Sequence, residues 1–265
     1  MGSTWPRAES KSEPARRVTS FDLGTFAAIL FDLDSTLIDT KRYPLKGSEW
    51  LLAKCVPEPS KILEPYVREL LRNYYGAMDR IVNGAPYRDP FDLVRGAMKA
   101  TLKSLGISAK PSLIDEATRM FRQLHLDLSE ANPGVPSLLQ RLKDRGTRMG
   151  VVSNSFDGHT KLIMEKLALS QFFDVLVDSG DARAYKPMKE PFEYALRGLG
   201  VESTSALYVG DEYLADVVGA WRAGMKSVWV NSRGHSLEES LAKYGPETVP
   251  LLVVNSITEL SSYLL

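Results

Sequence analysis

Short, unbroken apolar runs alternate with segments of helical periodicity along most of this 265-residue chain. The first run, residues 26–31, reads as a strand buried on both faces of a sheet, although the pattern alone also fits a buried helix. Later runs of the same kind predict further strands at 148–152, 175–177, 206–209, 227–230 and 251–254.

Segments that predict helices lie between these strands. They are 137–143, 157–167, 191–199, a helix ending at Ala223, and a terminal helix from Ile257. Repeated strand–helix units call for a parallel sheet with helices on both of its faces. The sequence therefore predicts an α/β core, formed by residues 21–40 and 129–265.

Helical patterns fill residues 41–128, where little of the sequence resembles a strand. The expected helices are 48–56, 61–81, 90–105 and 111–127, with proline or glycine at the joins. In the second helix the apolar positions recur at three- and four-residue intervals, at Ile62, Val67, Leu70, Leu71 and Tyr74. We therefore expect a helical insert within the α/β core.

Residues 1–20 mix serine, proline and charged residues without apolar periodicity, so we expect a disordered tail, whether or not it is a targeting segment. The sequence contains neither a hydrophobic signal region nor an apolar run long enough to span a bilayer. These features predict a cytoplasmic protein that does not associate with membranes.

Composition narrows the range of partners. Lysine plus arginine and aspartate plus glutamate number 33 each, so the overall charge gives no support for a nucleic-acid partner. An apolar content of 44% suffices for a sizeable core. The single Cys55 rules out an internal disulfide and is expected to be a small core residue. Either a monomer or a homodimer is compatible with these features.

Two carboxylates, Asp32 and Asp34, follow the first predicted strand. In an open parallel sheet this end of the strand is where ligands bind. Two such neighbours repel each other unless a cation or a shared proton lies between them, which suggests a divalent metal. Asp32 is the candidate nucleophile, attacking phosphorus to give an aspartyl-phosphate, and Asp34 is the candidate general acid and base. The alternative is that one aspartate caps a turn and the other is solvated.

Further polar residues follow later strands or lie in the loops. Ser153 and Asn154 offer a hydroxyl and a backbone amide to a phosphoryl oxygen, or Ser153 is simply a helix N-cap. Lys186 would offset the charge of phosphate and carboxylates, unless it is a solvated surface lysine. Asp211 is the natural metal ligand, with Asp216 as a ligand or as its support. Alternatively, these two aspartates are charges at a helix N-terminus.

This ordered set closely resembles the haloacid dehalogenase superfamily of aspartate-nucleophile hydrolases. The matching residues are Asp32-Leu33-Asp34-Ser35-Thr36, Ser153 after Val151-Val152, Lys186-Pro187, and Gly210-Asp211 with Asp216. The resemblance implies a Rossmann-like core with an α-helical cap domain, residues 41–128, inserted after the first motif. It also implies Mg²⁺ held by Asp32, Asp211 and the backbone carbonyl of Asp34, which are hard oxygen ligands. Ser35 departs from the family's phosphatases of this kind, which more often have glycine there.

The carboxylate of Asp34 favours one activity within the superfamily. Its dehalogenases lack a carboxylate at this position because halide leaves without a proton, so the sequence predicts a phosphatase rather than a 2-haloacid dehalogenase. A phosphosugar mutase is the runner-up because it uses the same motifs. A catalytically inactive binding module is opposed by the intact set of motif residues.

The substrate is expected to be a small phosphorylated metabolite, with specificity set by the cap. Five cap residues are candidates for contact with an anionic substrate: Tyr43, Lys46, Arg72, Tyr87 and Arg88. The loop 83–89, rich in glycine and proline, is predicted to face the substrate.

Overall fold

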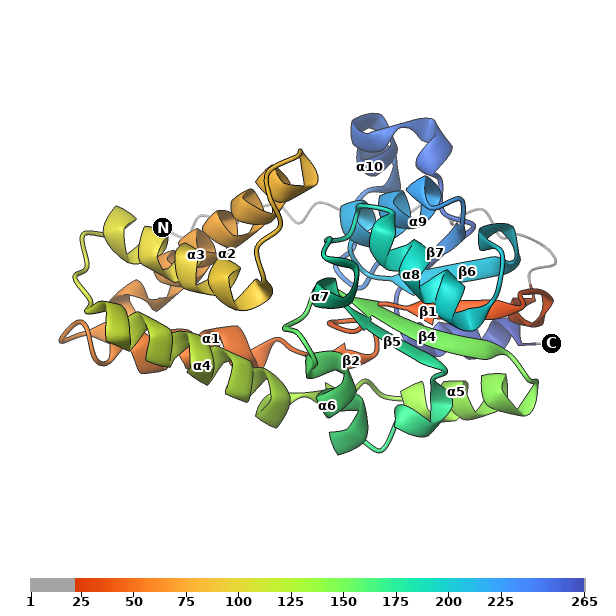
Figure 1. The fold of residues 1–265 in the computed structure, drawn as a ribbon, viewed down its shortest axis with the longest axis horizontal. Coiled ribbons are helices and arrows are strands. Elements are labelled where there is room, and N and C mark those ends of the chain that lie inside the picture. Colours follow the sequence, from red (N-terminus) through yellow and green to blue (C-terminus); the bar gives the residue numbers. More distant parts are fainter. Residues whose placement is uncertain (1–21, 265) are drawn as a thin grey trace, which may run out of the picture.

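A six-stranded parallel sheet lies at the centre of the structure, a computed structural model that describes residues 22–264. Its strand order is β5-β4-β1-β6-β7-β8 (Figure 1). The strands are β1 (Ala28–Phe31), β4 (Arg148–Ser153), β5 (Val175–Asp178), β6 (Ala206–Gly210), β7 (Lys226–Val230) and β8 (Leu252–Val254). Each corresponds to a strand predicted from the sequence, and the predicted α/β fold with an inserted helical cap is confirmed.

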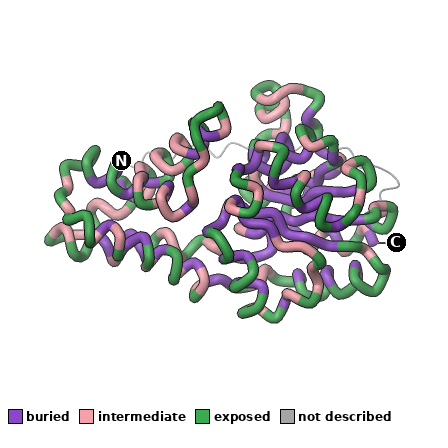
Figure 2. Tube along the Cα trace, in the orientation of Figure 1, coloured by how far each residue is buried: buried purple, intermediate pink, exposed green. Residues whose placement is uncertain are grey.

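Helices cover both faces of this sheet. Along β1, Ile29 and Phe31 pack on one side and Leu30 on the other, because successive strand residues point to opposite faces. One face is covered by α5 (Val135–Asp144), α6 (His159–Lys166) and the 3₁₀-helix η6 (Ile257–Tyr263), the other by α8 (Glu190–Leu199) and α9 (Gly219–Arg222). The buried strands therefore run as a continuous band between the two layers (Figure 2).

The chain reverses direction across the sheet at β1. After β1 it builds β4 and β5 on one side, and then returns to place β6 on the other side. The crevice beyond the carboxyl end of such a central strand is where open α/β sheets bind ligands. The topology thus directs attention to the residues that follow β1.

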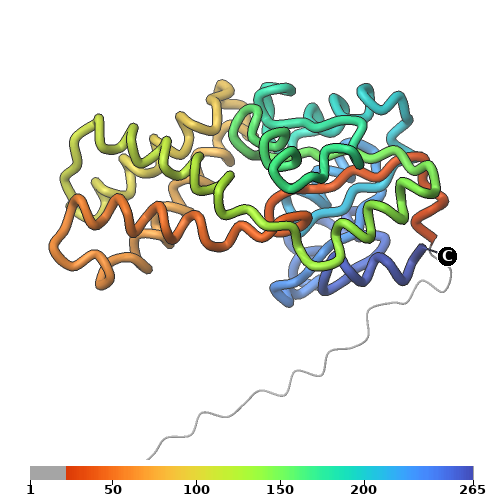
Figure 3. The backbone as a smooth tube through the Cα atoms, turned by 90° about the horizontal axis from the view of Figure 1, so that it is seen from below, coloured from red at the N-terminus to blue at the C-terminus, as the bar shows by residue number. Residues whose placement is uncertain are grey.

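Four helices form the cap, a separate body beside the sheet. They are α1 (Arg42–Leu52), α2 (Pro59–Val82), α3 (Pro90–Ser104) and α4 (Pro111–Leu128). They enclose their own apolar cluster, which includes Leu52, Tyr66, Met98 and Phe121. Figure 3 shows the cap and the core side by side. Two connecting segments join them: the outward passage, by which the chain enters the cap, and the return passage, by which it leaves the cap. These passages pair as a short antiparallel ladder, β2 (Ile38–Asp39) with β3 (Glu130–Ala131), that the sequence did not predict.

Several predicted elements differ from the observed ones. The first cap helix begins at Arg42, not at residue 48, because Pro44 lies in the first turn, where proline is tolerated. The predicted helix ending at Ala223 starts as a π-helix, η4 (Tyr213–Val218), before α9. Helix α10 (Leu237–Tyr244) was not predicted, and it buries no residue that would have given an apolar stripe.

The remaining elements are short. They are α7 (Ser179–Ala182) and 3₁₀ turns at Leu23–Thr25, Ser170–Phe172, Ser203–Ser205 and Pro246–Thr248. No helix within residues 22–264 combines the length and the apolarity needed to span a membrane. The tail predicted for residues 1–20 lies outside the described residues.

Helices α1 and α4 approach closely at Gly47, which yields a testable prediction. A Cβ atom at this position would lie 2.3 Å from Cε2 of the buried Phe121 ring. We expect Gly47→Ala to lower the free energy of unfolding by about 1–3 kcal/mol through overpacking, measured by chemical denaturation. The matched control is Gly76→Ala in α2, where the nearest atom would be 4.0 Å away. That variant is expected to be neutral or stabilised by up to about 1 kcal/mol, and equal effects of the two changes would contradict the close approach.

Candidate active site

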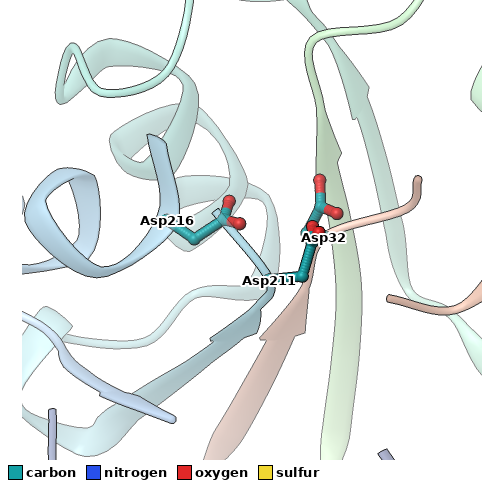
Figure 4. Close-up of side chains that lie close together, drawn as sticks. All are labelled: Asp32, Asp211 and Asp216. Atoms are coloured by element: carbon teal, nitrogen blue, oxygen red, sulfur yellow. The ribbon is translucent and has the colours of Figure 1, made fainter. Parts of the chain in front are cut away.

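Three buried carboxylates meet at the carboxyl edge of the sheet. Asp32 directly follows β1, Asp211 directly follows β6, and Asp216 lies in the π-helix η4 (Figure 4). One oxygen of each lies within 4.8 Å of the others. A Cβ atom at Gly210 would be 2.3 Å from Cγ of Asp216, so only glycine there lets this carboxylate approach the strand end.

The ammonium group of Lys186 lies within this carboxylate cluster. Its Nζ donates hydrogen bonds to Oδ1 of Asp32 at 2.6 Å, to Oδ1 of Asp216 at 2.7 Å and to the Tyr208 hydroxyl at 2.8 Å. The lysine is 2% exposed, so it is not a solvated surface residue. The side chain of Asn154 holds its main chain, accepting from the Lys186 amide and donating to the Lys186 carbonyl.

Burial and crowding shift the protonation of the cluster. Burial raises the pKa of Asp32 well above its usual value, against the attraction of Lys186 and together with the neighbouring carboxylates. Burial, followed by Asp216, raises the pKa of Asp211 to about 7, although the Arg233 guanidinium 2.8 Å away opposes the shift. For Lys186, burial alone would lower the pKa, but the charges of Asp216 and Asp32 outweigh it and raise the pKa. The three carboxyl groups therefore outnumber the two cations that contact them, Lys186 and Arg233.

The hydrogen bonds divide the carboxylates into two roles. Both oxygens of Asp216 are engaged, one by Lys186 and the other by the amide of Glu212 at 2.8 Å. Lys186 contacts Oδ1 of Asp32 and Arg233 contacts Oδ2 of Asp211, and each carboxylate keeps lone pairs with which it could bind a cation. Asp32 and Asp211 thus fit a metal with hard oxygen ligands, while Asp216 holds the lysine in place.

Asp34 occupies a different environment. Its side chain is 36% exposed and lines the cavity between core and cap. Its Oδ1 accepts a hydrogen bond from Nε2 of His125, at 2.7 Å, and His125 lies in the cap helix α4. Nδ1 of His125 is 3.4 Å from that of His159, whose pKa is lowered to about 4 by burial and by His125. The expected proton-transfer residue of the core is therefore contacted by the cap.

Ser35, where the family's phosphatases more often have glycine, has a backbone conformation that favours glycine. This residue has φ 64°, in the left-handed region that glycine adopts without steric cost. Its amide donates to the carbonyl of Ile38 at 2.8 Å, closing a tight turn. Serine thus occupies a conformation that favours glycine, and Asp34, which precedes it, lines the cavity.

Three consecutive polar residues, the last of β4 and the two that follow it, are placed differently. Ser153 is 1% exposed, its Oγ accepts from the amide of Ser155 at 3.1 Å, and it does not line the cavity. Asn154 and Ser155 do line it. The buried Oγ of Ser155 has no hydrogen-bond partner among the described residues. Contact between Ser153 and a phosphoryl group stays a prediction, and Ser155 is a donor that the sequence analysis did not single out.

A cavity of about 480 Å³ lies between the core carboxylates and the cap. Of the five proposed cap contacts, only Tyr43 lines it. Lys46 and Arg72 instead form ion pairs with neighbours on their own helices. The loop 83–89 packs against the core, contrary to the prediction: Tyr87 stacks on Tyr185, with ring centroids 5.5 Å apart, and the Tyr185 hydroxyl donates to the Arg88 carbonyl at 2.7 Å. Tyr87 therefore packs on an aromatic residue of the core and does not line the cavity.

Besides Ser155, sequence reasoning missed three further residues of the site. Arg233 follows the carboxyl end of β7 by three positions, a placement that would have drawn attention to it. Tyr208 looks like any other apolar residue of β6, although its hydroxyl contacts Lys186. His125 carries no local signal, because its partner Asp34 is 91 residues away in the chain.

Comparison with known proteins extends these observations. Residues 87–230 match the model of the family described as haloacid dehalogenase-like hydrolase. A glyceraldehyde 3-phosphate phosphatase of Methanothermobacter thermautotrophicus is 27% identical over 238 residues, 89% of this chain and 99% of that protein. A phosphoglycolate phosphatase of Aquifex aeolicus is 29% identical over 238 residues, 87% of this chain and 98% of that protein.

A solved structure shows how far the likeness in fold extends. The crystal structure of an L-2-haloacid dehalogenase covers 92% of this chain and 99% of its own, with a TM-score of 0.72 at 19% identity. The fold of this chain, with both its core and its cap, is therefore similar to that of a solved structure. The family match spans more than half of the chain and includes Ser153, Lys186 and Asp211. The chain belongs to the haloacid dehalogenase-like hydrolases.

Proposed function

We propose that this protein is a Mg²⁺-dependent phosphatase that hydrolyses a small phosphorylated metabolite through an aspartyl-phosphate on Asp32. The observation that carries the proposal is the pairing of a buried, lysine-bound Asp32 with an Asp34 that reaches the cavity two residues later. A nucleophilic carboxylate and a proton donor on one turn are what phosphate-ester cleavage requires. The phosphatase names of both relatives support the same reaction class.

The first half-reaction transfers the phosphoryl group to the enzyme. Oδ2 of Asp32 attacks phosphorus while Lys186 holds Oδ1 and fixes the direction of the carboxylate. Ser155 and the amides after β4 donate hydrogen bonds to phosphoryl oxygens. Protonated Asp34 gives its proton to the leaving oxygen, so the substrate departs as a neutral alcohol.

The second half-reaction restores the enzyme. Asp34, now ionised, removes a proton from a water molecule, whose oxygen attacks the phosphorus of the aspartyl-phosphate. The bond to Asp32 breaks and inorganic phosphate leaves. Asp32, Asp211 and the backbone carbonyl of Asp34 would hold Mg²⁺, whose charge would offset the negative charge of the phosphoryl group.

Asp34 also separates this proposal from haloacid chemistry. A departing halide takes no proton, so a dehalogenase has no use for a carboxyl group in the cavity. A likeness in fold to a dehalogenase at 19% identity does not bear on this choice. We place the reaction in the cytoplasm, a reducing setting that suits the free thiol of Cys55.

Replacement of the nucleophile tests the proposal directly. We expect Asp32→Asn to lower kcat for phosphate release by at least about 10⁴-fold, because an amide does not attack phosphorus. Asp144→Asn, which changes an exposed carboxylate on α5, is the matched control and is expected to retain full activity. Circular dichroism should show both variants folded. Turnover of Asp32→Asn near the wild-type rate would exclude Asp32 as nucleophile.

The metal requirement can be tested both by activity and by thermal stability. We expect chelation to abolish phosphate release and Mg²⁺ to restore it, with Ca²⁺ a poor substitute because it prefers longer bonds and more ligands. Mg²⁺ should also raise the thermal midpoint of wild-type protein, since it relieves repulsion among buried carboxylates. Asp211→Asn should reduce that shift. Full activity in excess chelator would overturn the metal requirement.

Leaving-group dependence isolates the role of Asp34. With a benzyl phosphate, whose alkoxide is a poor leaving group, Asp34→Asn should slow phosphorylation of the enzyme by roughly 10²- to 10⁴-fold. With p-nitrophenyl phosphate the loss should be smaller, because this phenolate needs little protonation. Single-turnover kinetics measure both rates. Equal losses for the two substrates would mean that Asp34 serves the metal or the fold instead of the proton.

A further inference from the structure

The wall of the cavity that faces the catalytic carboxylates is apolar. One stripe of helix α2 contributes six residues to it, at positions spaced three and four residues apart along the helix. The stripe consists of Val67, Leu70, Leu71, Tyr74, Tyr75 and Met78.

Part of this wall remains exposed to solvent within the cavity. Leu71 is 41% exposed, Tyr75 is 47% exposed, and Leu45, which lines the cavity from α1, is 46% exposed. Apolar side chains left uncovered and contiguous with a catalytic site indicate a surface that a ligand covers. The occupant closest to the carboxylates is the part of the substrate attached to the phosphoryl group.

Cations are absent from this wall within the described residues. Among the cavity-lining residues, Lys186 and Arg233 contact Asp32, Asp216 and Asp211, so they belong to the phosphoryl end. The third cation, Lys41, is an exposed residue at the N-terminus of α1, beside the passage into the cap.

The polar groups that the cap contributes to the cavity are phenols and the imidazole of His125, which is hydrogen-bonded to Asp34. Burial raises the pKa of Tyr43 well above its usual value, and it raises that of Tyr74 as well, so both hydroxyls stay neutral. A carboxylate or a second phosphate placed here would lose its water without gaining an opposite charge. A neutral hydroxyl or ring would lose little.

We propose that the leaving group of the substrate is an uncharged alcohol with an apolar or aromatic body, which packs on the α2 stripe while its phosphoryl group meets Asp32. This inference rests on the proposed phosphatase function and names its substrate class. A cavity of about 480 Å³ suits a leaving group of modest size.

Two substrates that differ only in a distant charge test the proposal. Benzyl phosphate and 4-carboxybenzyl phosphate share the same leaving oxygen, so a difference in kcat/KM reports recognition of the ring substituent. We expect wild-type protein with Mg²⁺ to favour benzyl phosphate by about tenfold or more. A preference for the carboxylated substrate would overturn the proposal, and its loss in Lys41→Ala would identify Lys41 as the anchor of a second anion.

A charge introduced into the stripe provides the second test. Leu71→Arg places a cation in the wall at a partly exposed position, and we expect it to reduce the preference for benzyl phosphate about tenfold or to reverse it. The matched control is Leu105→Arg, at the end of α3 away from the cavity, where the leucine is 37% exposed. The control should keep the wild-type preference. An unchanged preference in Leu71→Arg would overturn the proposal.

Failure of the inference and failure of the phosphatase function give different results. Release of phosphate from p-nitrophenyl phosphate, together with a preference for the carboxylated benzyl substrate, would reject the substrate class alone. No Asp32-dependent release from any of these three phosphomonoesters would reject the phosphatase function itself.

Discussion

The buried ammonium of Lys186 is the interaction on which the rest of the site depends. Its three hydrogen bonds join Asp32 after β1, Asp216 in η4 and Tyr208 in β6, groups that otherwise belong to separate elements. Removing one partner of a buried ion pair typically costs about 3–5 kcal/mol, because the other charge is left unpaired. The lysine therefore sets both the direction of Asp32, the proposed nucleophile, and the closeness of the carboxylates that would bind a metal ion.

Core and cap contribute different properties to the same cavity. The core supplies nearly all the charge, whereas the cap supplies an apolar wall and the imidazole of His125. Three of the hydrogen bonds that join the two bodies lie in the site or next to it: His125 to Asp34, the Tyr75 hydroxyl to Glu212, and the Tyr185 hydroxyl to the carbonyl of Arg88. Others lie farther away, such as those that Lys166 donates to the last carbonyls of α4. Because His125 belongs to the cap, a movement of the cap would alter the surroundings of Asp34.

Local patterns in the sequence were sufficient to predict the strands of the central sheet and the polar residues at their ends. Asp32 and Asp211 follow buried apolar runs, and parallel strands bring such ends to one edge, so their meeting followed from the fold class. Contacts between side chains that are far apart in the sequence could not be predicted from such local patterns. His125 reaches Asp34 because α4 ends beside the return passage into the core, and the loop 83–89 turns to the core because Tyr87 finds Tyr185. Periodicity predicts that α2 has an apolar face, but not that part of this face lines a cavity.

The turn after β1 explains why the proposed nucleophile, the proposed proton donor and the insertion of the cap occur together. Asp32 must lie at the end of a central strand, where Val209 of the neighbouring β6 accepts a hydrogen bond from its amide at 2.8 Å. The left-handed Ser35 then reverses the chain, at a cost of roughly 1–2 kcal/mol for a residue other than glycine. That reversal leaves Asp34 facing the cavity and leads the chain through β2 into the cap. Because the cap starts from this turn and returns through β3, which pairs with β2, its last helix necessarily ends near Asp34. The contact between His125 and Asp34 is therefore a consequence of where the cap is inserted.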